Sequence, residues 1–101
     1  MPYVKKQLRE LVDHKIDDLV VVLREQDQYS NGRDTKGLTN YTITRILIGV
    51  FGKDYEHDRK SYSLINDAIG VLGCVGLEFY RRLAAPYEDE KIKENGEVYD
   101  V

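Results

Sequence analysis

The densest group of residues able to recognise a ligand stands near the end of the sequence, at Tyr80, Arg81, Arg82 and Tyr87. An arginine guanidinium stays charged and can grip a phosphate through two parallel hydrogen bonds, while a tyrosine ring can stack on a base. Basic residues in the last turn of a helix also complement its dipole and can pair with acids such as those at 88–90. The group therefore predicts either a site for nucleotide phosphates or an ordinary helix end.

Helical geometry separates three members of this group. Successive helical residues point about 100° apart, so Tyr80, Arg81 and Arg82 are expected to face three different environments. Whether they act together depends on what faces each of them.

A second pair, Tyr41 and Arg45, lies four residues apart and hence on one face of a helix. In a concave site such a pair suits a small anion or a nucleotide, and on a flat surface it is a cation–π pair. Lys15 falls within the apolar stripe of the first predicted helix, where it either extends its ammonium to solvent or reaches a polar pocket. Asn66 offers an amide to a ligand or across a subunit interface. We add these four residues to the predicted ligand-binding set.

Signals for catalysis or metal binding are sparse. His14, His57 and Cys74 are isolated in the sequence, and the acids around His57 are typical of a solvated loop. No Gly-rich phosphate loop follows a strand, and no nucleophile elbow is present. All-α nucleotide pyrophosphohydrolases hold magnesium with paired acidic motifs on two helices, a pattern that is missing here. We therefore predict a protein without enzymatic activity, metal or cofactor.

The elements that must position these residues are helices. Apolar residues recur at three- and four-residue steps along residues 4–28, 40–51 and 61–85. The β-branched run in the second segment could form a strand, although its period is nearer 3.6 than 2. Pro86 is expected to end the third helix and redirect the chain into a short helix at 87–94, followed by an arm. The fold class predicted is all-α, a single small three-helix domain with a C-terminal helical turn and arm.

Local chemistry also predicts where these helices begin and end. Turn-forming residues across 29–37 predict a flexible loop. Capping and stop residues set the other boundaries. The caps are Thr39 or Asn40 and Ser61, and the stops are Gly52 and the Asn95-Gly96 pair.

The third predicted helix carries glycines at three-residue intervals. A glycine inside a helix costs about 1 kcal/mol relative to alanine, so three of them indicate that something approaches the backbone closely. We predict that this face packs against another subunit of a homo-oligomer. The predicted interface residues are Tyr62, Gly70, Gly73, Gly76 and Leu77.

Composition limits the kinds of partner that the protein is expected to bind. The net charge is −3, of which residues 86–101 carry −4, so the remaining chain is near neutral and offers no footprint for duplex nucleic acid. No apolar run approaches the roughly 18 residues that span a bilayer, and the N-terminal residues lack the apolar region of a secretory signal. With one cysteine there is no intrachain disulfide. A cytoplasmic protein without a membrane partner is expected. Eight tyrosines in 101 residues favour an interface or a stacking site.

Three segments resemble a family of small uncharacterised proteins found in phage and microbial genomes. They are PYV, LTNYTITRIL and SYSLINDAIGVLGCVGLEFYRRLAAPYEDEKIKENGEV. The resemblance implies a phage accessory protein rather than a housekeeping enzyme. Small oligomeric phage proteins include sponges that sequester the nucleotide messengers of bacterial defence, which is an analogy at the level of the family.

These observations give an ordered set of functional hypotheses. The first is a non-enzymatic, phage-encoded binding protein that sequesters a cyclic dinucleotide or a cyclic ADP-ribose type of signal at or near a subunit interface. The alternative is a protein–protein interaction module that inhibits or scaffolds a host protein. A nucleotide-processing enzyme is the third.

Overall fold

The computed structural model of the protein describes residues 3–101, apart from the side chains of Asp27 and Ser30. The described chain is all-helical, and it contains an isolated bridge between Asp54 and Arg59 but no strand. Contacts divide the chain into two compact units, residues 1–65 and 66–101. Each unit is described by itself.

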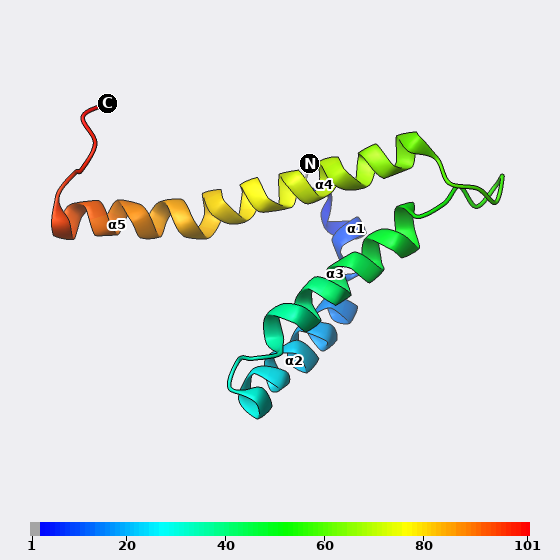
Figure 1. Cartoon of the computed structure of the whole chain (residues 1–101), viewed down its shortest axis with the longest axis horizontal. Coiled ribbons are helices and arrows are strands. Elements are labelled where there is room, and N and C mark those ends of the chain that lie inside the picture. The colour runs from blue at the N-terminus through cyan, green and yellow to red at the C-terminus, as the bar shows by residue number, and fades with distance from the viewer. Residues whose placement is uncertain (1–2) are drawn as a thin grey trace. The chain divides into compact units, whose positions relative to one another are not determined.

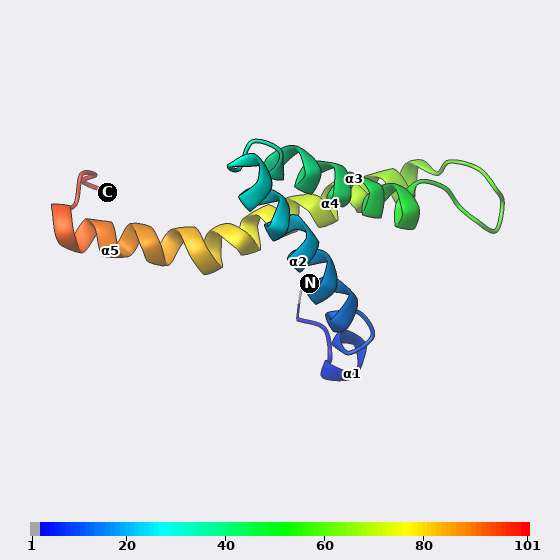
Figure 2. The same ribbon diagram turned by 90° about the horizontal axis from the view of Figure 1, so that it is seen from below.

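The first unit is a helical hairpin. The short helix α1 (Lys6–Arg9) leads into α2 (Asp13–Ser30), and α3 (Thr35–Phe51) packs beside α2 (Figures 1 and 2). The helix predicted at 4–28 is therefore interrupted at residues 10–12, where the backbone turns through shorter i to i−3 hydrogen bonds.

The connection between α2 and α3 is much shorter than the loop predicted at 29–37. Asn31 and Gly32 have φ angles of 52° and 79°, the left-handed region that asparagine and glycine tolerate best. The turn occupies residues 31–34 only. The two turn residues were thus predicted correctly, while the loop around them is helical.

Helix α3 begins at Thr35, so the predicted start at residue 40 is wrong. Thr39, Thr42 and Thr44 donate their hydroxyl hydrogens to carbonyls four residues back, at 2.7–2.8 Å. Because these bonds satisfy the hydroxyls within the helix, the threonine-rich segment stays helical and Thr39 does not act as a cap. The strand alternative for this segment is also wrong. Gly52 ends α3 as predicted.

The second unit is built on one continuous helix. The helix α4 (Tyr62–Phe79) passes through the π-helical turn η1 (Tyr80–Ala84) into α5 (Ala85–Asn95), as the unbroken ribbon in Figure 1 shows. At its start, the backbone N–H of Leu64 donates to Ser61 Oγ at 3.4 Å, as predicted for a cap. At its end, Gly96 has a φ of 86°, as predicted for a stop.

Pro86 does not end this helix, which corrects the prediction of two helices at 61–85 and 87–94. Proline cannot donate the usual hydrogen bond to the carbonyl four residues back, here that of Arg82. The π turn absorbs the defect, because the Ala85 N–H reaches five residues back to the Tyr80 carbonyl. The helix therefore continues for 34 residues, roughly 50 Å at 1.5 Å per residue.

The side chains that the structure describes form no buried core. None of the residues whose exposure is described is buried, and the least exposed apolar side chains in the hairpin are only half-buried.

One helix among the described residues, Tyr62–Asn95, is long and apolar enough to cross a membrane by length and composition alone. Its apolar window includes two acids, Asp67 and Glu78. A helix that forms the core of a soluble protein passes the same test.

Candidate functional site

The two adjacent arginines are both engaged with one carboxylate. Arg82 Nε donates to Glu78 Oε1 at 3.0 Å, and Arg81 Nη1 lies 3.9 Å from Glu78 Oε2. These pairs are spaced i, i+4 and i, i+3 on one helix, the spacing that brings side chains together on its surface. Both guanidiniums are more than half exposed, so each pair contributes little to stability. Arg81 and Arg82 thus share the Glu78 carboxylate, and their role in binding a ligand stays a prediction.

Tyr80 is tied to α5 across the π turn. Its hydroxyl donates to Glu88 Oε2 at 2.7 Å, a contact eight residues apart. The extra residue of a π turn brings positions eight apart onto one side of the helix. The hydrogen bond to Glu88 raises the pKa of Tyr80, with further contributions from desolvation and from the charges of Glu88 and Asp89. This hydrogen bond therefore links the first residue of the π turn to α5.

The pair Tyr41 and Arg45 is confirmed as a contact on α3. Arg45 Nη1 donates to the Tyr41 hydroxyl at 3.0 Å, and the guanidinium carbon lies 5.7 Å from the ring centroid. Both side chains are exposed, and Tyr41 is 56% accessible. The ring and the cation are thus held together on an open surface, which is the flat arrangement weighed from the sequence.

The remaining predicted ligand residues are dispersed. Tyr87 lies on α5, where Lys91 Nζ sits 5.5 Å from its ring centroid. Lys15 on α2 and Asn66 on α4 are exposed. Within each unit, the structure does not gather these residues with Tyr41 or Tyr80 into one cavity. Their roles in binding stay predictions.

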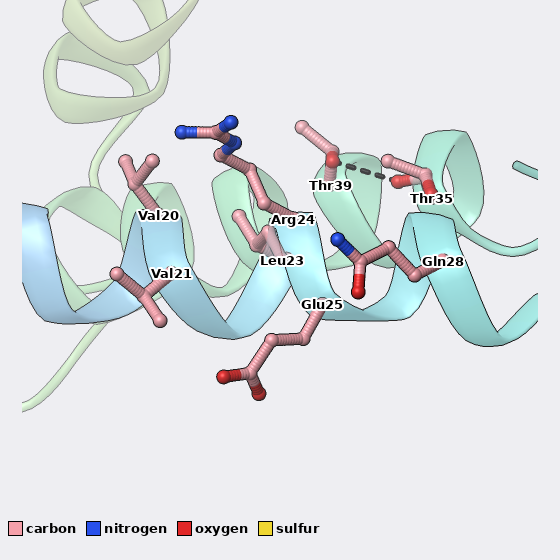
Figure 3. Close-up of a pocket in the computed structure, with 8 residues that line it drawn as sticks. All are labelled: Val20, Val21, Leu23, Arg24, Glu25, Gln28, Thr35 and Thr39. Carbon is pink, nitrogen blue, oxygen red and sulfur yellow. Dashed lines mark hydrogen bonds between the residues drawn. The ribbon is translucent and has the colours of Figure 1, made fainter.

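A groove of about 590 Å³ lies along α2 and α3 in the first unit (Figure 3). Its lining residues are Val20, Val21, Leu23, Arg24, Glu25, Gln28, Thr35 and Thr39. Arg24 and Glu25 extend to opposite sides of α2 in this view, so a cation and an anion flank the groove. None of these residues was predicted as a site residue, because a groove between helices depends on how they pack.

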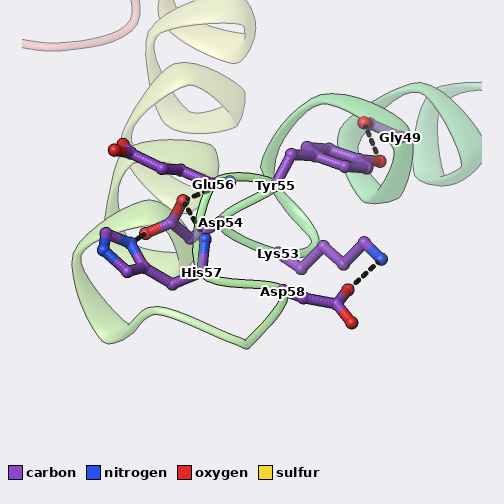
Figure 4. A network of polar contacts seen from close by, with 7 residues as sticks. All are labelled: Gly49, Lys53, Asp54, Tyr55, Glu56, His57 and Asp58. Carbon is purple, nitrogen blue, oxygen red and sulfur yellow. Dashed lines mark hydrogen bonds and ion pairs between the residues drawn. The ribbon is translucent and has the colours of Figure 1, made fainter.

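Among the described residues, the loop after α3 holds a group of metal-type ligand atoms (Figure 4). The ligand atoms of Asp54, Glu56 and His57 lie within 4.8 Å of one another. Asp54 Oδ1 accepts the backbone N–H groups of Glu56 and His57 at 3.0 and 3.4 Å, and Asp54 Oδ2 lies 2.7 Å from His57 Nδ1. The hydrogen bond to His57 lowers the pKa of Asp54, against a smaller desolvation effect that raises it, and the two backbone bonds lower it further.

This group folds the loop. Lys53 pairs with Asp58 at 2.6 Å, and the Tyr55 hydroxyl donates to the Gly49 carbonyl of α3 at 2.9 Å (Figure 4). Asp58 has a φ of 51°, a left-handed conformation that aspartate tolerates better than most residues. The carboxylate of Asp54 thus accepts hydrogen bonds within the loop, whose residues 55–60 are exposed.

The glycines of α4 lie open in the single chain. No atom lies within 4 Å of a Cβ built at Gly70, Gly73 or Gly76. The large side chains beside them are exposed, with Ile69 at 65% and Leu77 at 73%. Nothing described within residues 66–101 therefore accounts for three glycines in this helix.

The acids that hold these residues differ from those weighed from the sequence. Glu78, which was missed as a partner, pairs with the arginines, while Glu88, considered there as a partner of the arginines, accepts the Tyr80 hydroxyl. The i, i+3 and i, i+4 spacing of Glu78 to the arginines was a signal that could have revealed it. The contact of Glu88 could not be found that way, because it depends on the π turn.

The geometry defines a class of protein: a small helical chain with exposed apolar side chains on its helices and with polar contacts that lie on the surface. The family model described as Domain of unknown function (DUF6899) matches residues 1–98, and the chain belongs to this family. No curated protein and no solved structure matches the chain.

Proposed function

We propose that the protein is a non-enzymatic binding protein that works as an assembly of identical chains. The observation that carries this proposal is that no described residue of known exposure is buried in the single chain. Hydrophobic burial is the dominant favourable term in folding. A chain without buried side chains therefore needs another apolar surface to cover its own. In this proposal, other copies of the chain supply that surface.

Exposed apolar side chains within each unit support the same proposal. Val21 and Val22 in α2 are 55% and 50% exposed, and Ile69 and Leu77 in α4 are 65% and 73% exposed. Covering apolar surface is favourable by about 25 cal/mol per Å². In an obligate assembly, the folded chain and the complex form together.

Thermal unfolding at several protein concentrations tests the assembly. When folding and association are coupled, the Tm rises with total chain concentration. We expect a Tm that increases by several degrees between about 1 and 100 μM. A Tm that stays constant over this range, with a cooperative transition, would show that the single chain folds without partners.

The second candidate is the capture of a nucleotide by this assembly. In this proposal the protein is phage-encoded, acts in the cytoplasm and sequesters a cyclic dinucleotide or a cyclic ADP-ribose type of immune signal near a subunit interface. The observation it builds on is the exposed contact of Tyr41 with Arg45, a ring held beside a cation, which in this proposal becomes a concave site where a second chain covers it. The ion pairs recorded for residues 3–101 do not involve Arg45, so its charge is open to a phosphate.

Thermal shift with each nucleotide class tests the capture. A bound ligand stabilises the folded protein in proportion to its concentration above Kd. We expect Arg45→Ala to lose the shift, while Arg9→Ala, an exposed arginine in α1, keeps it. The ligand should return chemically intact after denaturation, because altered ligand would indicate an enzyme. No shift with any nucleotide, together with co-purification of a host protein, would favour the interaction module.

A further inference from the structure

We infer that a pocket at the C-terminal end of α3 binds a small molecule in which a phosphate group is attached close to a flat ring, such as a nucleoside monophosphate. The pocket has a volume of about 350 Å³, and all the residues that line it belong to the first unit. The inference does not depend on the proposed assembly. It names a site other than the contact of Tyr41 with Arg45.

Cations outnumber acids in the lining of this pocket by three to one. The cations are Lys53, Arg59 and Lys60, and the acid is Asp58. Lys53 and Asp58 pair at 2.6 Å and so offset each other's charge. The ion pairs recorded within residues 3–101 do not include Arg59 or Lys60. Their two positive charges are therefore available to an anion from outside the loop.

The backbone of the loop holds these cations close together. The Asp54 N–H donates to the Arg59 carbonyl at 2.7 Å, and the Arg59 N–H donates to the Asp54 carbonyl at 3.3 Å. This antiparallel bridge brings the residues on either side of it, Lys53 and Lys60, to the same end of the loop. Like charges in one pocket repel each other, and a bound phosphate relieves that repulsion.

The other acids of the loop leave the cations uncovered. Figure 4 shows the carboxylates of Asp54 and Glu56 pointing away from Lys53, on the side where His57 lies. Asp54 is held on that side by its contact with His57, at 2.7 Å. The negative charges of the loop thus gather on one side of it, apart from Asp58.

Tyr55 gives the pocket a fixed apolar wall (Figure 4). Its hydroxyl donates to the Gly49 carbonyl at 2.9 Å, and Lys53 Nζ lies 5.1 Å from its ring centroid. Ile48 lines the same pocket. A ring that is anchored in this way offers a surface on which the flat ring of a ligand can stack. Inorganic phosphate alone would not use this wall, which is why the inferred ligand carries both groups.

The end of α3 does not oppose an anion here. A helix C-terminus carries partial negative charge on its last carbonyl groups, which repels a phosphate. Two of these carbonyls already accept hydrogen bonds: that of Ile48 from the Gly52 N–H at 2.8 Å, and that of Gly49 from the Tyr55 hydroxyl. Lys53 adds a positive charge directly after the helix.

The volume of the pocket favours a small ligand. Ligand pockets in proteins span roughly 300–1,000 Å³. At about 350 Å³, this pocket lies at the lower end of that range. One phosphate and one ring system therefore suit it better than a dinucleotide does.

Calorimetric titration of the full chain with AMP, inorganic phosphate and adenosine tests the site. We expect AMP to bind most tightly, phosphate more weakly and adenosine least, because the cations supply most of the attraction and the ring adds to it. Arg59→Gln combined with Lys60→Gln should weaken AMP binding by about 10-fold or more. Both side chains are exposed, so the fold should persist. Arg9→Gln combined with Lys36→Gln removes the same charge from exposed positions of the same unit and should leave AMP binding unchanged.

Asp58→Asn gives a change in the opposite direction. This substitution removes the one acid of the pocket and releases Lys53, so AMP should bind several-fold more tightly. Asparagine tolerates the φ of 51° at this position as aspartate does, and the turn should therefore be retained. Damage to the loop would weaken binding and could not tighten it. An affinity that is unchanged or weaker overturns the inference.

The remaining outcomes separate this site from the nucleotide capture proposed above. AMP binding that survives in the Arg59 and Lys60 double variant but is lost in Arg45→Ala places the nucleotide at Tyr41 and Arg45, which overturns the inference and leaves the capture standing. Equal affinities for AMP and adenosine, or for AMP and phosphate, show that one of the two groups plays no part and also overturn it. The absence of saturable AMP binding at millimolar concentration overturns the inference, while the assembly is tested separately by the dependence of Tm on concentration.

Discussion

Shortening one exposed side chain on α4 gives a quantitative test of the account. Leu77 is 73% exposed in the single chain. Full burial of a leucine contributes about 1.5–3 kcal/mol, so roughly 1–2 kcal/mol is still available when another chain covers it. In a pair of chains that covers this side chain on both copies, the residue counts twice, and Leu77→Ala then costs about 2–4 kcal/mol of association, or roughly 30- to 700-fold in Kd.

The same substitution has almost no effect on an isolated chain. Leucine and alanine have similar helix propensities, and an exposed side chain loses little on truncation. Sedimentation equilibrium over a dilution series measures the difference directly. Cys74→Ala is the control, because Cys74 is exposed on α4 and lies about 100° around the helix from Gly73. If Leu77→Ala changed Kd by no more than Cys74→Ala does, the coverage of this face by a second copy would be refuted.

Two further predictions concern the end of α3 and the loop after it. A Cβ at Gly52 would collide with the Ile48 carbonyl oxygen, so Gly52→Ala should destabilise the protein in urea unfolding. Gly49→Ala, at an open helical site, should instead stabilise it by about 1 kcal/mol, and equal effects at both sites would contradict the steric argument. The pKa of Asp54 lies below its ordinary value of 3.8. Its ionised carboxylate therefore stabilises the folded loop above that pH, and this stabilisation is lost as the pH falls through the folded-state pKa. NMR titration should find the midpoint below 3.8 and move it upward in His57→Ala, whereas a midpoint unaffected by that change would rule out the hydrogen bond as the cause.

The helix ends predicted correctly are those set by local chemistry. Ser61 accepts a backbone N–H at the start of α4, and Gly96 ends α5 with a positive φ. Gly52 and the Asn31-Gly32 turn belong to the same group. In each case the residue itself carries the conformational preference or the hydrogen-bonding group, so the sequence is sufficient.

The errors arise where a neighbour compensates for an unfavourable residue. Pro86 by itself is expected to end a helix, because it lacks a backbone N–H. In the π turn before it, the Ala85 N–H donates to the Tyr80 carbonyl, and the helix continues without that missing N–H. The segment from Thr35 to Thr39 contains residues that compete with the helix backbone, yet Thr39 bonds back to the Thr35 carbonyl and extends α3. Such compensation depends on several residues adopting one geometry together, which a residue-by-residue prediction misses.

The candidate site was predictable in part. The contact of Tyr41 with Arg45 follows from their spacing, and the structure confirms it. The groove along α2 and α3 was missed because helix packing, and not spacing along one helix, creates it. The binding of a nucleotide by any of these residues stays a prediction.

The mass of the native protein in solution tests the central claim most directly. Sedimentation equilibrium at micromolar concentration, in buffer without detergent or ligand, reports that mass independently of shape. The account predicts a multiple of the 11.7 kDa chain mass that dissociates on dilution. A stable, cooperatively folded species of 11.7 kDa at every protein concentration measured would contradict it.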